Sequence, residues 1–366
     1  MPDFIGMDVF DADAFTAVSL TKAVNMMGYV PQTLSQIPGL FEEVPIRTKE
    51  VWIERRGYAA QVLQTTARST PPKQVNGDRR DARAFNTVRI ADASRVTVDE
   101  LQSIRRFGSE IDLKDLADEV SRRMFKITAN HDLTEEFHRL NVVTLGKTLD
   151  ADSSVIYDWT AEFGSAPSGA QALSAISEVA FNFAAGTEGS VRLSCNGLVR
   201  AITRNLRGLG GTNVKIVGLC GDSFWDQLVT HPDVRSTFKN WPAAAELRNL
   251  IGEAFTGSGA AASGGGAYAP FEFANIEFIN YRGTDDASTV AVDTAHCKFF
   301  PRNAGIFQVA RAPAEKFEFL NSPGQKRYAW VVRDKERDMW ADIEVMTYPL
   351  HVCALPQALA SGRAGA

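Results

Sequence analysis

Apolar residues recur every three or four positions over residues 113–145, which is the strongest periodicity in the chain. This spacing puts the apolar side chains on one face of a helix. Asp112 suits the N-cap position, Asn130 is the one polar interruption, and Gly146 ends the pattern. At 1.5 Å per residue the pattern predicts a rod of about 50 Å, long enough to brace a flat, elongated domain. The apolar positions are Leu113, Leu116, Val120, Met124, Ile127, Leu133, Phe137 and Leu140.

A period of two marks two segments on either side of a polar stretch, which indicates a long two-stranded hairpin over residues 47–91. The first segment, around Val51 and Ile53, alternates clearly, and the return segment "RAFNTVRIA" alternates less cleanly. Between them lie Pro71-Pro72 and Asn76-Gly77, which are turn-forming residues. A lone two-stranded ribbon is marginally stable in water, so this one needs a partner surface.

Beyond residue 150, strands and helices do not alternate strictly, which indicates an α+β fold. Residues 34–46, with two X-Pro steps and a glycine, are expected to be extended and irregular. Residues 256–269, "TGSGAAASGGGAYA", predict a flexible loop. The other expected strands lie at 153–163, 213–221, 271–283 and 329–355, and the other expected helices at 191–211, 222–241 and 243–255.

The distribution of charge says more than its total. The 366 residues are 45% hydrophobic and 23% charged, which excludes general disorder, and the net charge of −5 argues against a dedicated nucleic-acid or membrane binder. Residues 47–89, however, hold ten basic and four acidic residues, so this arm carries +6 and the remainder −11. A basic arm on an acidic body suits subunits in which the arm of one copy lies across its neighbour.

The four cysteines are widely spaced and form no C-x-x-C pair, so we expect buried, reduced thiols rather than a metal or disulfide framework. The acidic first residues, "MPDFIGMDVFDADAF", lack the features of a signal peptide, and no stretch approaches 18 apolar residues. These features predict a protein made in a reducing cytoplasm, with no membrane segment.

The segment "GLCGDSFWD", with Asp293 and His296 further on, has the spelling of a GDS-type serine hydrolase. Ser223 would then be the nucleophile and His296 its base. The two lie 73 residues apart in the second half of the chain, whereas that family places them near opposite ends. We favour the alternative that Asp222 or Ser223 caps a helix whose apolar residues pack inward.

The sequence contains weak signals for one metal site and one phosphate-binding loop. His131, Glu135 and His138 share one face of the predicted long helix but lack a fourth ligand, so a solvated or interface face is favoured. The glycines of "RGLGGTNVKI" precede a strand, whereas a phosphate-binding loop follows one, so they indicate a helix C-cap. We expect no catalytic, metal or cofactor-binding residues.

Four stretches, taken in order, resemble the major capsid proteins of tailed bacteriophages, and more closely the lambda-like major capsid protein E family. The similarity runs from about residue 35 to 358 and rests on the order and character of segments together with short matches. The stretches are "LSQIPGLFEEVPIRTKEVWIERRG", "DRRDARAFNTVRI", "IVGLCGDSFWDQLVTHPDVRSTF" and "CKFFPRNAGIFQVARAPAEKFEFLNSPGQKRYAWVVRD".

The resemblance implies a tailed-phage capsid fold, in which extended loops lap over the adjacent subunit and axial domains meet around five-fold and six-fold axes. On this view the hairpin lacks a core of its own because its core is another molecule. The implied parts are an N-terminal arm (1–46), an extended loop (47–91), a peripheral domain with the spine helix at about 113–145 (92–187), an axial domain (188–334), and C-terminal strands that return to the peripheral domain with a tail (335–366).

The resemblance also implies the function and the partners. The chain would form pentamers and hexamers of an icosahedral shell that encloses double-stranded DNA, contacted non-specifically, in the virion after assembly in the host cytoplasm. A portal protein and a separate scaffolding protein are implied, because the chain has no room for a cleaved scaffolding segment; a decoration protein and a cargo-enclosing bacterial shell of the same fold stay open. The inter-subunit contacts expected in the extended loop are Arg55, Arg56, Arg68, Lys73, Arg79, Arg80 and Arg83.

Overall fold

The computed structural model describes nine stretches of the 366-residue chain. They are residues 33–56, 80–103, 112–164, 175–184, 189–239, 270–281, 283–284, 290–337 and 339–365. The expected hairpin tip, the expected helix at 243–255 and the expected glycine loop at 256–269 lie outside them.

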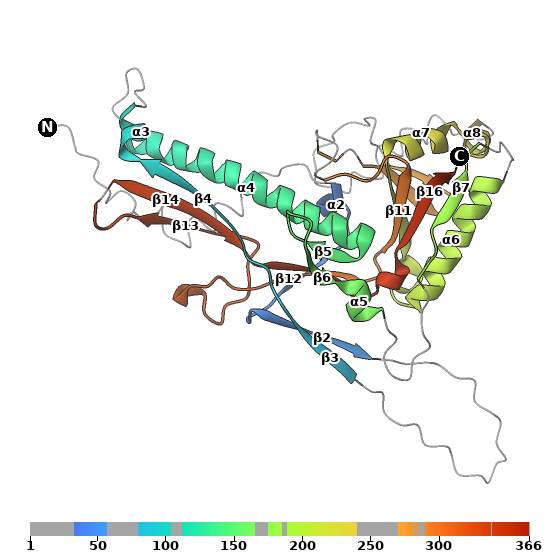
Figure 1. Ribbon diagram of the computed structural model, residues 1–366, viewed down its shortest axis with the longest axis horizontal. Helices are drawn as coiled ribbons and strands as arrows, with labels where there is room; N and C mark the ends of the chain where they lie inside the picture. The colour runs from blue at the N-terminus through green and yellow to red at the C-terminus, as the bar shows by residue number, and fades with distance from the viewer. Residues whose placement is uncertain are drawn as a thin grey trace, which may run out of the picture.

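The predicted long helix is confirmed as α4, Asp112–Leu145, which spans much of the molecule in Figure 1. It packs on a three-stranded antiparallel sheet of order β13-β14-β4, and Val120, Met124 and Ile127 meet residues such as Ile343 in that core. The predicted apolar face is wrong at Leu133, which is 42% exposed. The strands are β4, Ile90–Thr97, β13, Tyr328–Arg333, and β14, Trp340–Thr347; α3, Val98–Ser103, follows β4.

A second sheet, of order β1-β12-β15, lies at the middle of the molecule. Through β1 it joins the segment at residues 34–46 to strands from the C-terminal half of the chain. Residues 34–46, expected to be extended and irregular, are irregular over 37–41 and extended in the strand at 42–45. The expectation is wrong at 34–36, which belong to a short helix, and Leu34, Ile37 and Leu40 are buried in the main core. The elements are α2, Thr33–Gln36, β1, Glu42–Pro45, β12, Phe307–Arg311, and β15, Pro349–Cys353. Beside them β5, Lys147–Leu149, pairs with β6, Val155–Asp158.

The largest sheet has six strands in the order β7-β16-β11-β8-β10-β9, and helices α6, α7 and α8 lie around it (Figure 1). Its parallel pairs are β8 with β10 and β7 with β16. The strands are β7, Val179–Asn182, β8, Lys215–Cys220, β9, Phe271–Phe273, β10, Ile276–Asn280, β11, His296–Arg302, and β16, Ala360–Gly365. The helices are α6, Ser190–Leu206, α7, Asp222–Thr230, and α8, Pro232–Lys239.

Two expected strands are in fact two elements each. Residues 271–283 form the hairpin β9–β10, which turns at Ala274 and Asn275, with φ of 50° and 63°. Residues 153–163 form β6 and then a short helix, α5, Trp159–Phe163. Asp158 ends the strand because its carboxylate accepts hydrogen bonds from the backbone N–H groups of Thr160 and Ala161 in that helix.

The C-terminal segment, 335–366, divides between sheets. β14 pairs with β4 and β13 beside α4, β15 joins the middle sheet, and β16 joins the six-stranded sheet. β16 carries Gly362 because a side chain there would collide with the rings of Phe181 and Phe299. The C-terminal segment thus contributes one strand to each of the three larger sheets, which ties these sheets together. Within the described residues, no helix is long and apolar enough to cross a membrane.

Candidate functional site

The predicted hairpin is confirmed at its base, where β2, Glu50–Arg56, pairs antiparallel with β3, Arg80–Asn86. It leaves the molecule on the side opposite to α4 in Figure 1. Arg55, Arg56 and Arg80 belong to this paired part, and Arg68, Lys73 and Arg79 lie outside the described residues.

Phe85 anchors the base of the hairpin to its own subunit. Its side chain is buried, and its ring meets those of Tyr157, Trp159 and Phe163 edge-on at centroid distances of 5.5, 5.2 and 5.7 Å. The Trp159 ring is fully buried, and its Nε1 donates to the Thr148 hydroxyl at 3.0 Å. The expectation that the hairpin takes its core from another molecule is therefore wrong for its base.

Polar contacts reinforce this anchor. Arg83 Nη1 lies 2.7 Å from Glu162 Oε2 and donates to the Glu162 carbonyl at 3.0 Å. The backbone N–H of Asn86 donates to the Tyr157 hydroxyl at 3.1 Å. Arg83, expected at an inter-subunit contact, thus has a partner in its own chain, and the hairpin leaves the subunit in a fixed direction.

A buried group of charges ties α4 to the middle sheet. Arg311 of β12 lies 2.8 Å from both carboxylate oxygens of Glu135, and Arg139 lies 2.8 Å from one of them. Arg311 also reaches Glu43 of β1 at 3.2 Å. Burial alone raises the pKa of the Glu135 carboxyl, but the charges and hydrogen bonds of Arg311, with the charge of Arg139, hold that pKa well below its usual range. The N-terminal strand, β12 and the long helix are thereby joined at one point.

His131 and His138 lie in this buried region of their own subunit, which corrects the expectation of a solvated or interface face. Both side chains are almost fully buried, as is Glu135 between them. The ring of His138 meets that of His351 from β15 at 5.6 Å. Among the described residues no group of His, Cys, Asp and Glu side chains is arranged to hold a metal ion.

These histidines predict a steep loss of stability in acid. Burial lowers the pKa of His131, His138 and His351, and the charges of Arg139 and His138 lower that of His351 further. The unfolded chain therefore binds more protons, so stability is complete above the unfolded pKa of about 6.5 and falls below it, by up to about 1.4 kcal/mol per pH unit for each histidine.

The measurement is urea unfolding of the subunit between pH 7.5 and pH 5. His351→Gln removes one of the three buried imidazoles and should flatten this slope. An unchanged slope in His351→Gln would contradict the explanation.

The structure does not join Ser223 and His296 as a hydrolase would. The Ser223 hydroxyl accepts a hydrogen bond from Gln227 at 3.2 Å. His296 lies 3.2 Å from Asp293 and 3.4 Å from Glu178, through its two ring nitrogens. The expected cap is also wrong, because Gly221 occupies the N-cap of α7 and no side chain caps it. The inward packing is confirmed for the buried Phe224 and Leu228, with Trp225 half-buried.

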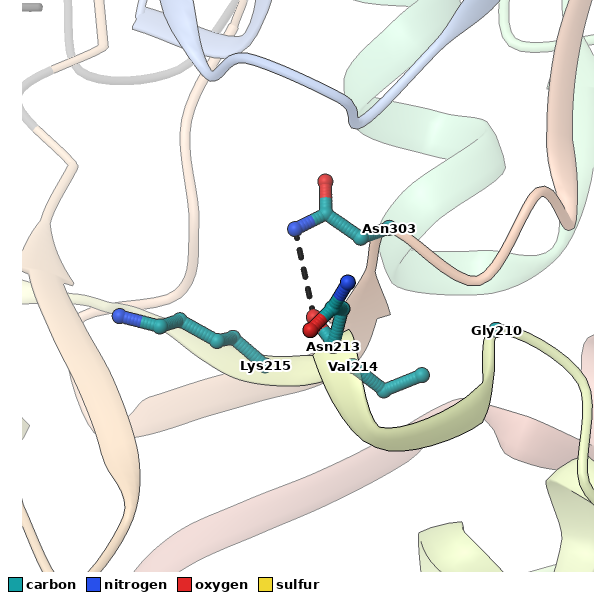
Figure 2. Close-up of a pocket in the computed structure, with 5 residues that line it drawn as sticks. All are labelled: Gly210, Asn213, Val214, Lys215 and Asn303. Atoms are coloured by element: carbon teal, nitrogen blue, oxygen red, sulfur yellow. Dashed lines mark hydrogen bonds between the residues drawn. The ribbon is translucent and has the colours of Figure 1, made fainter.

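A hollow of about 480 Å³ lies between the turn after α6 and the end of β11. Figure 2 shows that its one dashed contact joins the Asn303 amide to the Asn213 carbonyl, at 3.3 Å, while Lys215 extends away from them. Gly210 and Val214 complete its lining. Of these five residues only Lys215 titrates, so the hollow offers no acid–base pair.

All four cysteines are free and buried, as expected. Burial raises the pKa of Cys195 and of Cys353 to about 12, so these thiols stay protonated. Cys220 and Cys297 face each other across β8 and β11 with their sulfurs 3.2 Å apart.

The sequence reasoning missed the anchor at Phe85 and the pairing of Arg311 with Glu135. The return strand held a signal for the first, since Phe85 is its one aromatic residue. Nothing local signals the second, because 176 residues separate the partners.

Comparisons with known proteins find similar sequences and structures. Residues 16–364 match the family described as phage major capsid protein E. The major capsid protein of Pseudomonas phage KPP10 is 25% identical over 78% of this chain and 79% of its own length. The major capsid protein of Salmonella phage Felix O1 is 24% identical over 92% of this chain and 94% of its own length.

Among solved structures, the mature capsid of bacteriophage PhiM1 is similar at a TM-score of 0.48 and 9% identity, covering 92% of this chain and 88% of that one. The putative capsid protein of an E. coli CFT073 prophage is similar at a TM-score of 0.47 and 11% identity, covering 97% of this chain and all of that one.

Proposed function

The chain belongs to the phage major capsid protein E family, and we propose that it assembles as pentamers and hexamers into an icosahedral shell enclosing double-stranded DNA. The observation that carries the proposal is the family match, which extends over nearly the whole chain, residues 16–364. The long helix α4 and the hairpin that leaves the molecule support it, because a shell subunit needs a rigid spine and a surface that reaches its neighbours.

In this proposal the subunit acts structurally and has no catalytic role. The region around α4 is the peripheral domain, the six-stranded sheet with α6, α7 and α8 is the axial domain, and the hairpin is the extended loop. A portal protein and a scaffolding protein take part in assembly in the host cytoplasm, and the basic hairpin residues contact neighbouring copies.

The test is the size and form of the assembled protein. Light scattering and electron micrographs of the expressed chain, with its scaffolding protein where required, should show closed megadalton shells. Particles from a phage lysate should contain this chain and nuclease-protected double-stranded DNA. A chain that stays a monomer or dimer under all these conditions would contradict the shell, and shells filled with protein cargo would favour the bacterial alternative.

A further inference from the structure

The loop between β12 and β13, residues 312–327, exposes two large apolar side chains. Phe317 is 97% exposed and Leu320 is 71% exposed, whereas Phe319 between them is buried. Large apolar side chains that are exposed on a fixed backbone suit a contact with a partner.

The backbone of this loop is fixed by several contacts. The Phe319 ring packs edge-on against Tyr328 at 4.8 Å, in a small core that includes Tyr348. The Ser322 hydroxyl donates to the Phe319 carbonyl at 2.7 Å, and the Gly324 N–H donates to the Ile46 carbonyl at 2.9 Å. Phe317 and Leu320 are therefore presented on a held turn, which lowers the entropy cost of binding.

The turn carries one cation and two carboxylates, and the charge of Glu318 acts on Lys316. Lys316 Nζ lies 3.8 Å from the centre of the Trp330 ring, so this cation is directed at its own subunit. Glu315 and Glu318 are exposed beside Phe317. We name Glu315, Phe317, Glu318 and Leu320 the acidic knob: two apolar side chains with two carboxylates beside them.

We propose that the acidic knob binds the arginine-rich hairpin of a second copy of this chain. The contact is made where the pairing of β2 with β3 ends, at Arg55, Arg56 and Arg80. Charge complementarity selects this occupant, because residues 47–89 carry +6 and the knob is acidic. The proposal rests on the proposed shell, to which it adds the surface that receives the hairpin.

Arginine suits both halves of the knob. A guanidinium stacks on an aromatic ring such as Phe317, and its N–H groups pair with a carboxylate such as Glu318. The base of the hairpin, held by Phe85, cannot swing freely, and the knob turn is fixed as well. Two fixed surfaces of opposite charge define one relative position of the two copies, which a regular shell requires.

The experiment is crosslinking between copies that carry one new cysteine each. One preparation carries Glu318→Cys, which keeps Phe317 and Leu320, and the other carries Arg55→Cys or Arg56→Cys, adjacent positions that sample both faces of the strand. The native cysteines are buried, so a short bis-maleimide added to co-assembled shells reacts mainly with the new ones. We expect a crosslinked dimer as the main product for at least one mixture.

The matched control replaces Glu318→Cys by Leu193→Cys, an exposed position of α6, and should give at most a tenth of that dimer. As a second measurement, Phe317→Ser with Leu320→Ser should leave the melting temperature of the subunit unchanged and abolish closed shells. Intact shells without the dimer, or with these two serines, would overturn the knob contact alone. Failure of the wild-type chain to form shells would overturn the proposed function and this contact with it.

Discussion

Replacing Arg311 with methionine should lower the free energy of unfolding of the subunit by about 3–5 kcal/mol, the usual cost of removing one partner of a buried ion pair. Arg311 supplies two of the three short contacts of the Glu135 carboxylate, and Arg139 supplies the third. Methionine would leave a buried carboxylate facing an apolar chain, with Arg139 as its remaining cation. The loss also frees Glu43, so β1 should loosen from β12 first.

Two variants separate this effect from general damage. Arg95→Met removes a similar pair, since Arg95 holds Asp342 through two hydrogen bonds of 2.8 and 2.9 Å, but at an exposed position where water replaces the lost contacts. Its effect should be much smaller. Adding Glu135→Gln to Arg311→Met removes the stranded charge and should recover part of the loss. Urea unfolding at pH 7.5 measures all three; equal losses for Arg311→Met and Arg95→Met would contradict the argument.

Periodicity predicted α4 within one residue, because the helix is set by its own apolar spacing and by Gly146, whose φ of +65° favours glycine. The same spacing could not show which side chains the helix buries in its second half. There Glu135 and His138 are buried while Leu133 is exposed, since the partner surface is polar and comes from β12 and β15. Burial of a charge depends on a partner that the local sequence does not contain.

The turn between β9 and β10 and the strand β16 also depend on features that the local sequence does not signal. The alternation over residues 271–283 predicts one strand, since Ala274 is not a typical turn residue, yet both central residues of the turn between β9 and β10 adopt positive φ. β16, "ASGRAG", was not distinguished as a strand of the large sheet because small residues carry no strand pattern. Its composition is set by the rings of Phe181 and Phe299 against Gly362, a fact of packing between distant segments.

For the candidate site, the sequence indicated the hairpin and its charge but not its attachment. Alternation and turn residues predict two paired strands, and composition predicts that the arm is basic. Whether Arg83 faces its own subunit depends on α5, Trp159–Phe163. The sequence predicts a strand, not a helix, for these residues. Arg83 pairs with Glu162 of that helix, so this arginine of the hairpin is held by its own subunit.

Reversing the charge of Arg79 and Arg80 to glutamate should leave a soluble, folded subunit that forms no stable shells. The change takes the hairpin from +6 to +2, and it lies beyond the aromatic anchor at Phe85, so the fold of the subunit should not depend on it. Each exposed pair contributes a few tenths to about 1 kcal/mol, but the contact repeats around a closed shell. A small loss per contact therefore becomes a large loss for the assembly.

Lys335→Glu with Arg337→Glu is the matched control, since it makes the same change of net charge in the exposed segment between β13 and β14. Thermal unfolding of the subunit and sedimentation of the assembled particles report the two effects separately. Because exposed charges are screened by salt, wild-type shells should dissociate at a salt concentration that leaves the subunit folded. Normal shells from the Arg79 and Arg80 reversal would contradict the charge contact and favour apolar contacts between the hairpin and its neighbour. Wild-type shells that stay intact at high salt would contradict the charge contact by a separate measurement.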